Sequence, residues 1–105
     1  MSGDFKPNYA PVYCAALYPG LAKIFFEHGY ALAVHGSLAR DFDLIAVPWV
    51  RSPSSVKEVL KAMTAKFAVR IDRDQPEKQE HGRITYALSV GFGTCYIDLS
   101  FMPTI

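Results

Sequence analysis

The sequence contains few of the residues that would indicate a metal cage, a disulfide framework or a membrane span. Its two cysteines, Cys14 and Cys95, are widely separated and match no zinc-ligand spacing. We expect both to be small core residues in a reducing compartment. No apolar run approaches the roughly 20 residues that span a bilayer, and the first residues show no secretory pattern. The default expectation is therefore a cytoplasmic protein without a membrane partner.

An excess of either charge is also missing. The formal net charge is +1, so there is no broad basic field to bind nucleic acid through counterion release. Half of the residues are hydrophobic and a fifth are charged, which is typical of a globular protein with a buried core. The length of 105 residues suits a single domain over residues 1–105, with residues 1–10 as an N-terminal tail.

The first half of the chain begins with a helical pattern. Apolar residues recur at helical spacing from Pro11 to His28. Because a proline lacks the backbone N–H that a helix interior needs, Pro19 predicts one short helix ending near Leu17 and a second starting at Pro19. Gly29 then stands where a left-handed C-terminal cap is expected.

Two short apolar runs and a second helical pattern follow. The runs at 30–35 and 42–47 are predicted to be central strands buried on both faces. A helix is predicted over 51–67, and its start matches two capping patterns. Either Ser52 caps it with a proline at the first helical position, or Ser55 and Glu58 form a capping box.

The second half of the chain reads as strands around a polar loop. Residues 68–71 are a candidate third strand, and residues 72–82 are predicted to be a solvated loop. Residues 84–90 and 96–101 alternate apolar and polar side chains, which predicts an antiparallel hairpin. The expected fold is α+β (α/β), with a mixed sheet of four or five strands and two or three helices packed on one face.

Three aspartates lie in the predicted strands. Asp41 and Asp43 are two residues apart, so their side chains project from the same face of a strand. Asp98 alternates with apolar residues in the last strand, which places it on the face opposite the core. Carboxylates gathered on one face repel each other unless a cation lies between them. Magnesium accepts such oxygens and leaves positions for a substrate phosphate.

The same aspartates also admit structural roles. Asp41 could cap a turn, and Asp98 could face water from a one-sided sheet. Asp43 could pair with a basic side chain instead of a metal ion. The arginines considered for that pairing are Arg40, Arg70 and Arg83.

The stretch Ala33–Ser37 followed by Asp41–Ile45 resembles the nucleotidyltransferase superfamily. The pattern of that family is an apolar strand, then Gly-Ser or Gly-Gly, then Asp-x-Asp in the next strand, then a third acidic residue in a later strand. Asp98 is the candidate for the third acidic residue. The resemblance covers residues 30–101 in outline and is specific around 33–49 and 96–103.

The sequence of His35–Asp41, together with that of Ile45–Trp49, also resembles a group of small phage and prophage proteins. A chain of that kind would act in the cytoplasm of the host cell.

The resemblance implies a role for each motif residue. Gly36 and Ser37 would contact the triphosphate of a bound nucleoside triphosphate. Asp41, Asp43 and Asp98 would bind Mg²⁺, and Asp98 could also activate the hydroxyl group of an acceptor as a base. The implied reaction is the transfer of a nucleoside monophosphate to that hydroxyl group.

The chain departs from the family between the two motifs. Three residues separate Ser37 from Asp41, where the family has a longer stretch that usually opens a helix. Three residues cannot form that helix, so its phosphate-attracting N-terminus is missing and the first strand must turn almost directly into the second. Arg40 could compensate by pairing with phosphate. It could equally pair with Asp41 or Asp43 in an inactive site.

Several other residues have both a ligand-binding and a structural interpretation. His35 could touch a ligand or be a hydrogen-bonded structural histidine. His81 and Arg83 could bind substrate phosphate or belong to a solvated loop. Three aromatic residues could stack on a base or pack against the protein: Trp49, Tyr86 and Tyr96.

Three functions therefore remain open from the sequence. The first is a small Mg²⁺-dependent nucleotidyltransferase. The second is a catalytically inactive domain of the same fold that binds a nucleotide or a host or phage protein; the short connection between the motifs favours it, as does the lack of room for the acceptor-holding domain of active family members. The third is a partner or inhibitor protein without a ligand, which would show aspartates paired with arginines and an exposed apolar patch.

Overall fold

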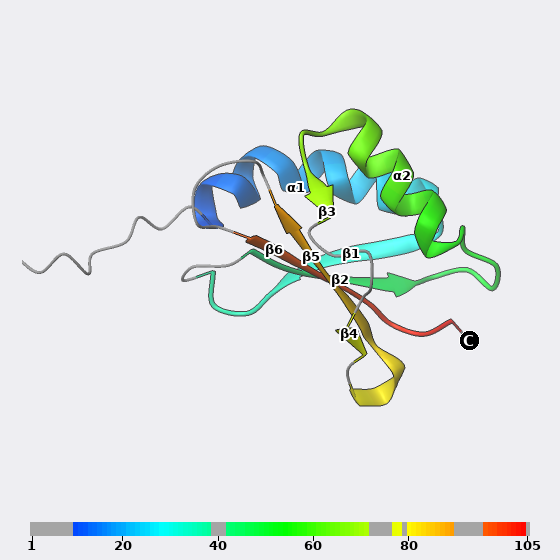
Figure 1. Ribbon diagram of the computed structural model, residues 1–105. Coiled ribbons are helices and arrows are strands. Elements are labelled where there is room, and N and C mark those ends of the chain that lie inside the picture. Colours follow the sequence, from blue (N-terminus) through cyan, green and yellow to red (C-terminus); the bar gives the residue numbers. More distant parts are fainter. Residues whose placement is uncertain (1–9, 39–41, 72–76, 79, 90–95, 105) are drawn as a thin grey trace, which may run out of the picture.

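The protein is built on one mixed β-sheet with both α-helices on the same side of it (Figure 1). The computed structural model describes residues 10–38, 42–71, 77–78, 80–89 and 96–104. The elements in chain order are α1 (Ala10–Glu27), β1 (Tyr30–His35), β2 (Phe42–Pro48), α2 (Val56–Lys66), β3 (Arg70–Ile71), β4 (Glu77–Lys78), the 3-10 turn η1 (Glu80–Gly82), β5 (Ile84–Ser89) and β6 (Tyr96–Phe101).

The strand order is β1-β2-β6-β5-β3, and β4 pairs with β5 outside this path. The β2–β6 pair is parallel, and the other pairs are antiparallel. The predicted α+β class, mixed sheet and antiparallel β5–β6 pairing are confirmed. The sheet has six strands rather than four or five, because β4 forms within the segment that was predicted to be a solvated loop.

One face of the sheet is covered and the other is open. Tyr30 and Leu32 of β1 are buried, whereas Ala31 and Ala33, which alternate with them, are exposed. The prediction that β1 is a central strand buried on both faces is therefore wrong. It is an edge strand, and its exposed face carries alanines, which cost little to leave in water because their side chains are small. β2 is a central strand, as predicted, but its buried residues likewise alternate with partly or fully exposed ones, so the prediction of burial on both faces is wrong for this strand too.

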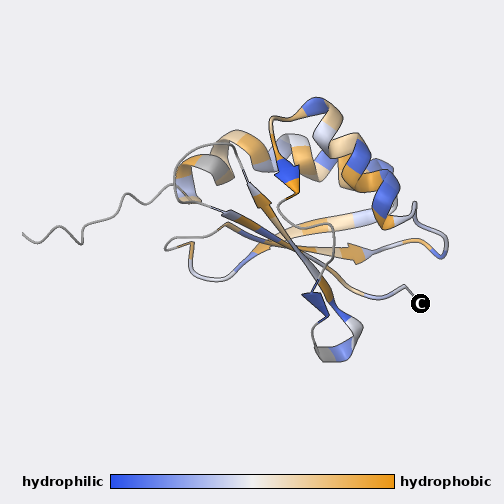
Figure 2. Ribbon diagram, viewed as in Figure 1, coloured by the Kyte–Doolittle hydropathy of each residue, from blue (hydrophilic) through white to orange (hydrophobic). Residues whose placement is uncertain are grey.

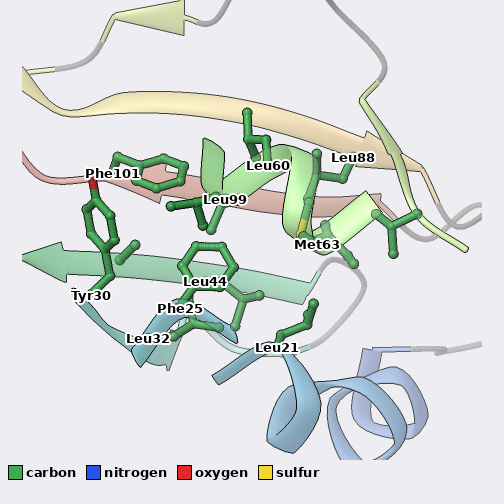
Figure 3. Close-up of a cluster of buried hydrophobic side chains, with 14 of the residues drawn as sticks. Leu21, Phe25, Tyr30, Leu32, Leu44, Leu60, Met63, Leu88, Leu99 and Phe101 are labelled. Atoms are coloured by element: carbon green, nitrogen blue, oxygen red, sulfur yellow. The ribbon is translucent and has the colours of Figure 1, made fainter. Parts of the chain in front are cut away.

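The core lies between the covered face and the two helices (Figure 3). Leu21 and Phe25 come from α1, and Leu60 and Met63 come from α2. The strands contribute Tyr30, Leu32, Phe42, Leu44, Ala46, Leu88, Ile97, Leu99 and Phe101. Hydrophilic residues lie on the outer side of α2 (Figure 2), as expected for an amphipathic helix that packs one stripe against a sheet.

Phe101 is the centre of an aromatic cluster within this core. Its ring centroid lies 5.9 Å from that of Phe25, 5.4 Å from that of Tyr30 and 5.9 Å from that of Tyr86. The tyrosine rings meet it edge-on, at 84°, which is a favoured geometry for aromatic pairs. The cluster joins α1, β1, β5 and β6.

The first helix is continuous through Pro19, so the predicted break near Leu17 is wrong. Tertiary contacts on both sides of the proline explain the difference. The Tyr18 hydroxyl donates to the Leu32 carbonyl oxygen at 2.6 Å, and Leu21 is fully buried. Burial of this helical face offsets the cost of a missing hydrogen bond. The helix ends as predicted, with Gly29 at φ +93°.

The second helix begins at Val56, and Ser55 rather than Ser52 is its N-cap. The Ser55 hydroxyl accepts from the Glu58 backbone N–H at 3.2 Å, and the Glu58 carboxylate accepts from the Ser55 backbone N–H at 3.1 Å. This is the capping box, one of the two predicted starts, and the Ser52 alternative is wrong. The hydrogen bond from the Ser55 backbone lowers the pKa of Glu58, and the hydrogen bond from the Ser55 side chain adds a smaller contribution in the same direction.

Pro19→Ala should stabilise the protein if α1 is continuous. The alanine restores a backbone N–H in the helix interior, where proline costs about 3 kcal/mol relative to alanine, so we expect a gain of roughly 1–3 kcal/mol. Pro11→Ala is the matched control. Pro11 lies in the first turn of α1, where the backbone N–H has no helical partner, and we expect a change within about 1 kcal/mol. Urea denaturation measures both variants, and equal effects would contradict the continuous helix.

Candidate functional site

The candidate site lies on the open face of the sheet, where two aspartates from distant parts of the chain are neighbours. Asp43 of β2 and Asp98 of β6 are register partners in the parallel pair, followed by Leu44 and Leu99. Both leucines are buried under the helices. Successive side chains of a strand point to opposite faces, so the two aspartates project from the open face. Both are partly buried, and the prediction that Asp98 lies opposite the core is confirmed.

The same register row extends to the neighbouring strands. His35 of β1 is the partner of Asp43, and Ala87 of β5 is the partner of Asp98. The His35 Nε2 atom is buried and has no hydrogen-bond partner in the described part of the chain. Buried polar atoms are usually paired. The structural alternative for His35, a hydrogen-bonded histidine, is therefore not seen among the residues that the structure describes. The row His35–Asp43–Asp98–Ala87 crosses four strands.

Gly36 follows His35 directly and lies against the Asp43 carboxylate. Its φ is +80°, a conformation that residues with a side chain rarely adopt. A β-carbon added at Gly36 would collide with the Asp43 carboxylate oxygen and would lie 3.2 Å from Asp43 Cγ. A glycine at this position therefore lets the carboxylate of the next strand approach the backbone of the turn. The resemblance implied instead that Gly36 contacts the triphosphate of a bound nucleotide.

The connection between β1 and β2 reverses the direction of the chain, as predicted. The two strands pair antiparallel up to His35 and Asp43, so the first strand turns back into the second, as the three-residue spacing predicted. Ser37 is exposed in this turn, and the half-buried Leu38 has a positive φ of 58°. Two other predicted site residues, Arg40 and Asp41, lie outside the described residues.

The described residues show neither an ion pair of Asp43 with Arg70 or Arg83 nor a group of three ligating side chains close enough to hold a metal ion. That search did not include Asp41, the third carboxylate of the predicted set. Asp43 and Asp98, two of the three predicted metal ligands, are therefore brought together. The alternative in which Asp43 pairs with Arg70 or Arg83 is not seen in the described residues.

The three aromatic candidates are separated by the fold. Tyr86 lines the covered side of the sheet and contacts Phe101, so it is on the wrong face for a ligand at Asp98. Trp49 is six positions beyond Asp43, which is roughly 20 Å along an extended strand. Tyr96 is two positions before Asp98 on the same face of β6 and is 45% exposed. Of these three residues, Tyr96 is the one placed to stack on a base bound at the aspartates.

His81 and Arg83 lie away from the aspartates. His81 is exposed in η1, and Arg83 directly precedes β5. Arg83 is four residues from Ala87, the partner of Asp98, which corresponds to about 13 Å along an extended strand. A surface turn explains both residues better than a contact with phosphate at Asp98.

A polar pair beside the aspartates was missed in the sequence. The hydroxyl groups of Thr85 and Ser100 lie 2.9 Å apart, and the two residues are register partners in β5 and β6. Ser100 is 3% exposed, so this pair satisfies a buried hydroxyl group two positions from Asp98. The alternation of polar residues along 96–101 was the available indication.

Comparisons of the chain with protein-family models, with curated proteins and with solved structures found no match. Within the described residues, no helix is long and apolar enough to cross a bilayer. A functional assignment therefore rests on the residues and geometry of this chain.

Gly36→Ala should destabilise the protein through two separable effects. The positive φ costs about 1–3 kcal/mol for a residue with a side chain, and the collision with the Asp43 carboxylate adds to it. Gly82→Ala is the matched control, because Gly82 has a φ of +75° and an added β-carbon would lie 3.4 Å from Pro103, which is ordinary contact. We expect the larger loss of unfolding free energy, measured by urea denaturation, at Gly36.

A double mutant isolates the carboxylate contact. In an Asp43→Ala background, Gly36→Ala should cost no more than Gly82→Ala, because the atoms that collide are gone. If Gly36→Ala costs the same in both backgrounds, the close approach of Asp43 to Gly36 is contradicted.

Proposed function

We propose that this protein is a nucleotidyltransferase-like protein that binds a nucleoside triphosphate with Mg²⁺ on the open face of its sheet and transfers the nucleoside monophosphate to a hydroxyl acceptor. The observation that carries the proposal is the register pairing of Asp43 with Asp98. These residues come from the two motifs that resemble the nucleotidyltransferase pattern, and the fold places them side by side.

The chemistry of the paired aspartates supports a cation at this position. Adjacent strands are about 4.8 Å apart, so side chains of register partners on one face can reach a common cation. A divalent cation between the two aspartates would be bound by both carboxylates. Their oxygens are hard ligands of the kind that Mg²⁺ prefers, and Mg²⁺ keeps coordination positions for water and phosphate. Asp43 and Asp98 would hold the ion together with Asp41, the third carboxylate of the motif.

The proposed reaction assigns a task to each motif residue. The backbone at Gly36 and the Ser37 hydroxyl would bind phosphate oxygens, and Arg40 would neutralise their charge. Asp98 would accept the proton of the acceptor hydroxyl. The oxygen of that hydroxyl would attack the α-phosphorus as the bond from the α-phosphorus to pyrophosphate breaks. Bound Mg²⁺ would supply charge neutralisation on the phosphate oxygens. Tyr96 would stack on the base, because it is exposed on the same face as Asp98.

A catalytically inactive domain that binds a nucleotide or a protein is the second candidate. Two observations favour it. β1 and β2 pair antiparallel up to His35 and Asp43, and the three residues between Ser37 and Asp41 are too few for the helix whose N-terminus attracts phosphate in the family pattern. An exposed aromatic pair offers a surface for a protein partner: the rings of Phe26 and Trp49 are stacked at 4.6 Å and are 58% and 52% exposed. In this alternative, the partner would be a host or phage protein in the host cytoplasm.

Calorimetric titration tests the binding of metal ion and nucleotide that the first candidate requires. Mg²⁺ alone, and then each nucleoside triphosphate with Mg²⁺, would be titrated into the wild type and into Asp43→Asn and Asp98→Asn. We expect the wild type to bind and both variants to bind at least about tenfold more weakly, since even the hydrogen-bond partners of metal ligands are worth that much. Glu27→Gln is the control, because it removes one negative charge from the exposed end of α1.

The titration is combined with measurements of pyrophosphate release and of the stability of the variants. Release of pyrophosphate in the presence of a hydroxyl acceptor would identify an active enzyme. No heat from the wild type, combined with an Asp43→Asn variant that is as stable as the wild type or more stable, would rule out the enzyme. That outcome would leave the inactive domain, whose partner could be tested through Trp49→Ser.

A further inference from the structure

A recess on the covered side of the sheet, named here the α2 recess, belongs to none of the motifs above. Its volume is about 310 Å³, which is at the lower end of the range for small-molecule sites. It is formed where α2 meets the edge of the sheet at β3 and β5. The lining residues are Lys57, Leu60, Lys61, Thr64, Ile71 and Tyr86.

One wall of the α2 recess carries positive charge. Lys57 and Lys61 are one helical turn apart on α2, so their side chains lie on the same side of the helix. Like charges at this spacing disfavour each other, and none of the described residues that line the recess is acidic. Thr64 continues the polar wall. An anion between the lysines would relieve their repulsion.

The other wall is apolar. Leu60 is 5% exposed, and Figure 3 shows it in the core together with Leu88 and Met63. Ile71 and the ring of Tyr86 complete this wall, and Tyr86 is held edge-on by Phe101. A tyrosine phenol is protonated at neutral pH, and burial raises the pKa of Tyr86 further, so this group can donate a hydrogen bond. The two lysines and the Tyr86 phenol, which can all donate hydrogen bonds, thus border an apolar surface.

The α2 recess is separate from the aspartates. Tyr86 is the register partner of Leu99 on the covered side, whereas the next pair, Ala87 and Asp98, belongs to the open face. A ligand in the recess would therefore be divided from a nucleotide at Asp43 and Asp98 by the thickness of the sheet.

We propose that the α2 recess binds a small organic anion, consisting of an apolar body with one carboxylate or phosphate group. The apolar body would lie against Leu60, Ile71 and Tyr86. The anionic group would lie at Lys57 and Lys61, the cationic wall of the recess. This site does not depend on the proposed nucleotidyltransferase function.

Three probes with the same ring system test the charge requirement. Indole-3-acetate is anionic, indole-3-acetamide is neutral and tryptamine is cationic, so they differ chiefly in the charge that faces the lysines. In titrations followed by ¹H–¹⁵N NMR, we expect the anion to shift the amide signals of Leu60, Ile71 and Tyr86. The neutral probe should bind roughly fivefold more weakly, as expected for one or two exposed charge pairs, and the cation more weakly still.

Paired variants locate the site. Lys57→Gln/Lys61→Gln should reduce affinity for indole-3-acetate to that of the neutral probe. Lys23→Gln/Lys78→Gln removes the same charge from exposed positions outside the recess and should leave the affinity unchanged. Asp43→Asn should also leave it unchanged, which separates this site from the proposed nucleotide site. Absence of binding by the anion, equal binding of anion and cation, or equal loss in both lysine pairs would overturn the proposal.

Discussion

The parallel pairing of β2 with β6 is the interaction on which both the core and the candidate site depend. It sets Leu44 beside Leu99 under the helices and Asp43 beside Asp98 on the open face. Because side chains alternate along a strand, a slip of one residue would turn the leucines to water and the aspartates into the core. Burial of the apolar row therefore also fixes the position of the polar row. The stability of the core and the geometry of the carboxylates have one cause.

The one-sided cover of the sheet gives the two faces different chemistry. Both α-helices pack on the same side (Figure 1), and the aromatic cluster around Phe101 joins α1 to the strands. The open face keeps polar groups in contact with water, so Asp43 and Asp98 avoid the desolvation cost of full burial. The α2 recess lies at the edge of the covered side, where α2 meets β3 and β5. Any ligand of the recess would act from the opposite side of the sheet.

Local rules worked where a few neighbouring residues decide the structure. The Ser55–Glu58 capping box starts α2, and Gly29 ends α1, because each involves only the adjacent turn. The same rules failed where distant contacts decide. Pro19 does not end α1, since Leu21 and Tyr18 are held by the sheet, and the apolar pattern of β1 did not reveal an edge strand because exposed alanines look like core residues. The two-residue strand β4 exists only through its pairing with β5.

The α+β class, the alternation that puts Asp98 opposite the core and the short β1–β2 connection could be predicted from the sequence, because they follow from side-chain periodicity and from the spacing of residues. Tertiary structure alone decided that Asp43 and Asp98 are neighbours, that His35 shares their row and that the Asp43 carboxylate lies against Gly36. It also decided which aromatic residue shares a face with the aspartates and that lysines of α2 border an apolar recess. The reason is that strand order and register join segments far apart in the chain, and the spacing of residues along a sequence carries no information about which strand becomes the neighbour of another.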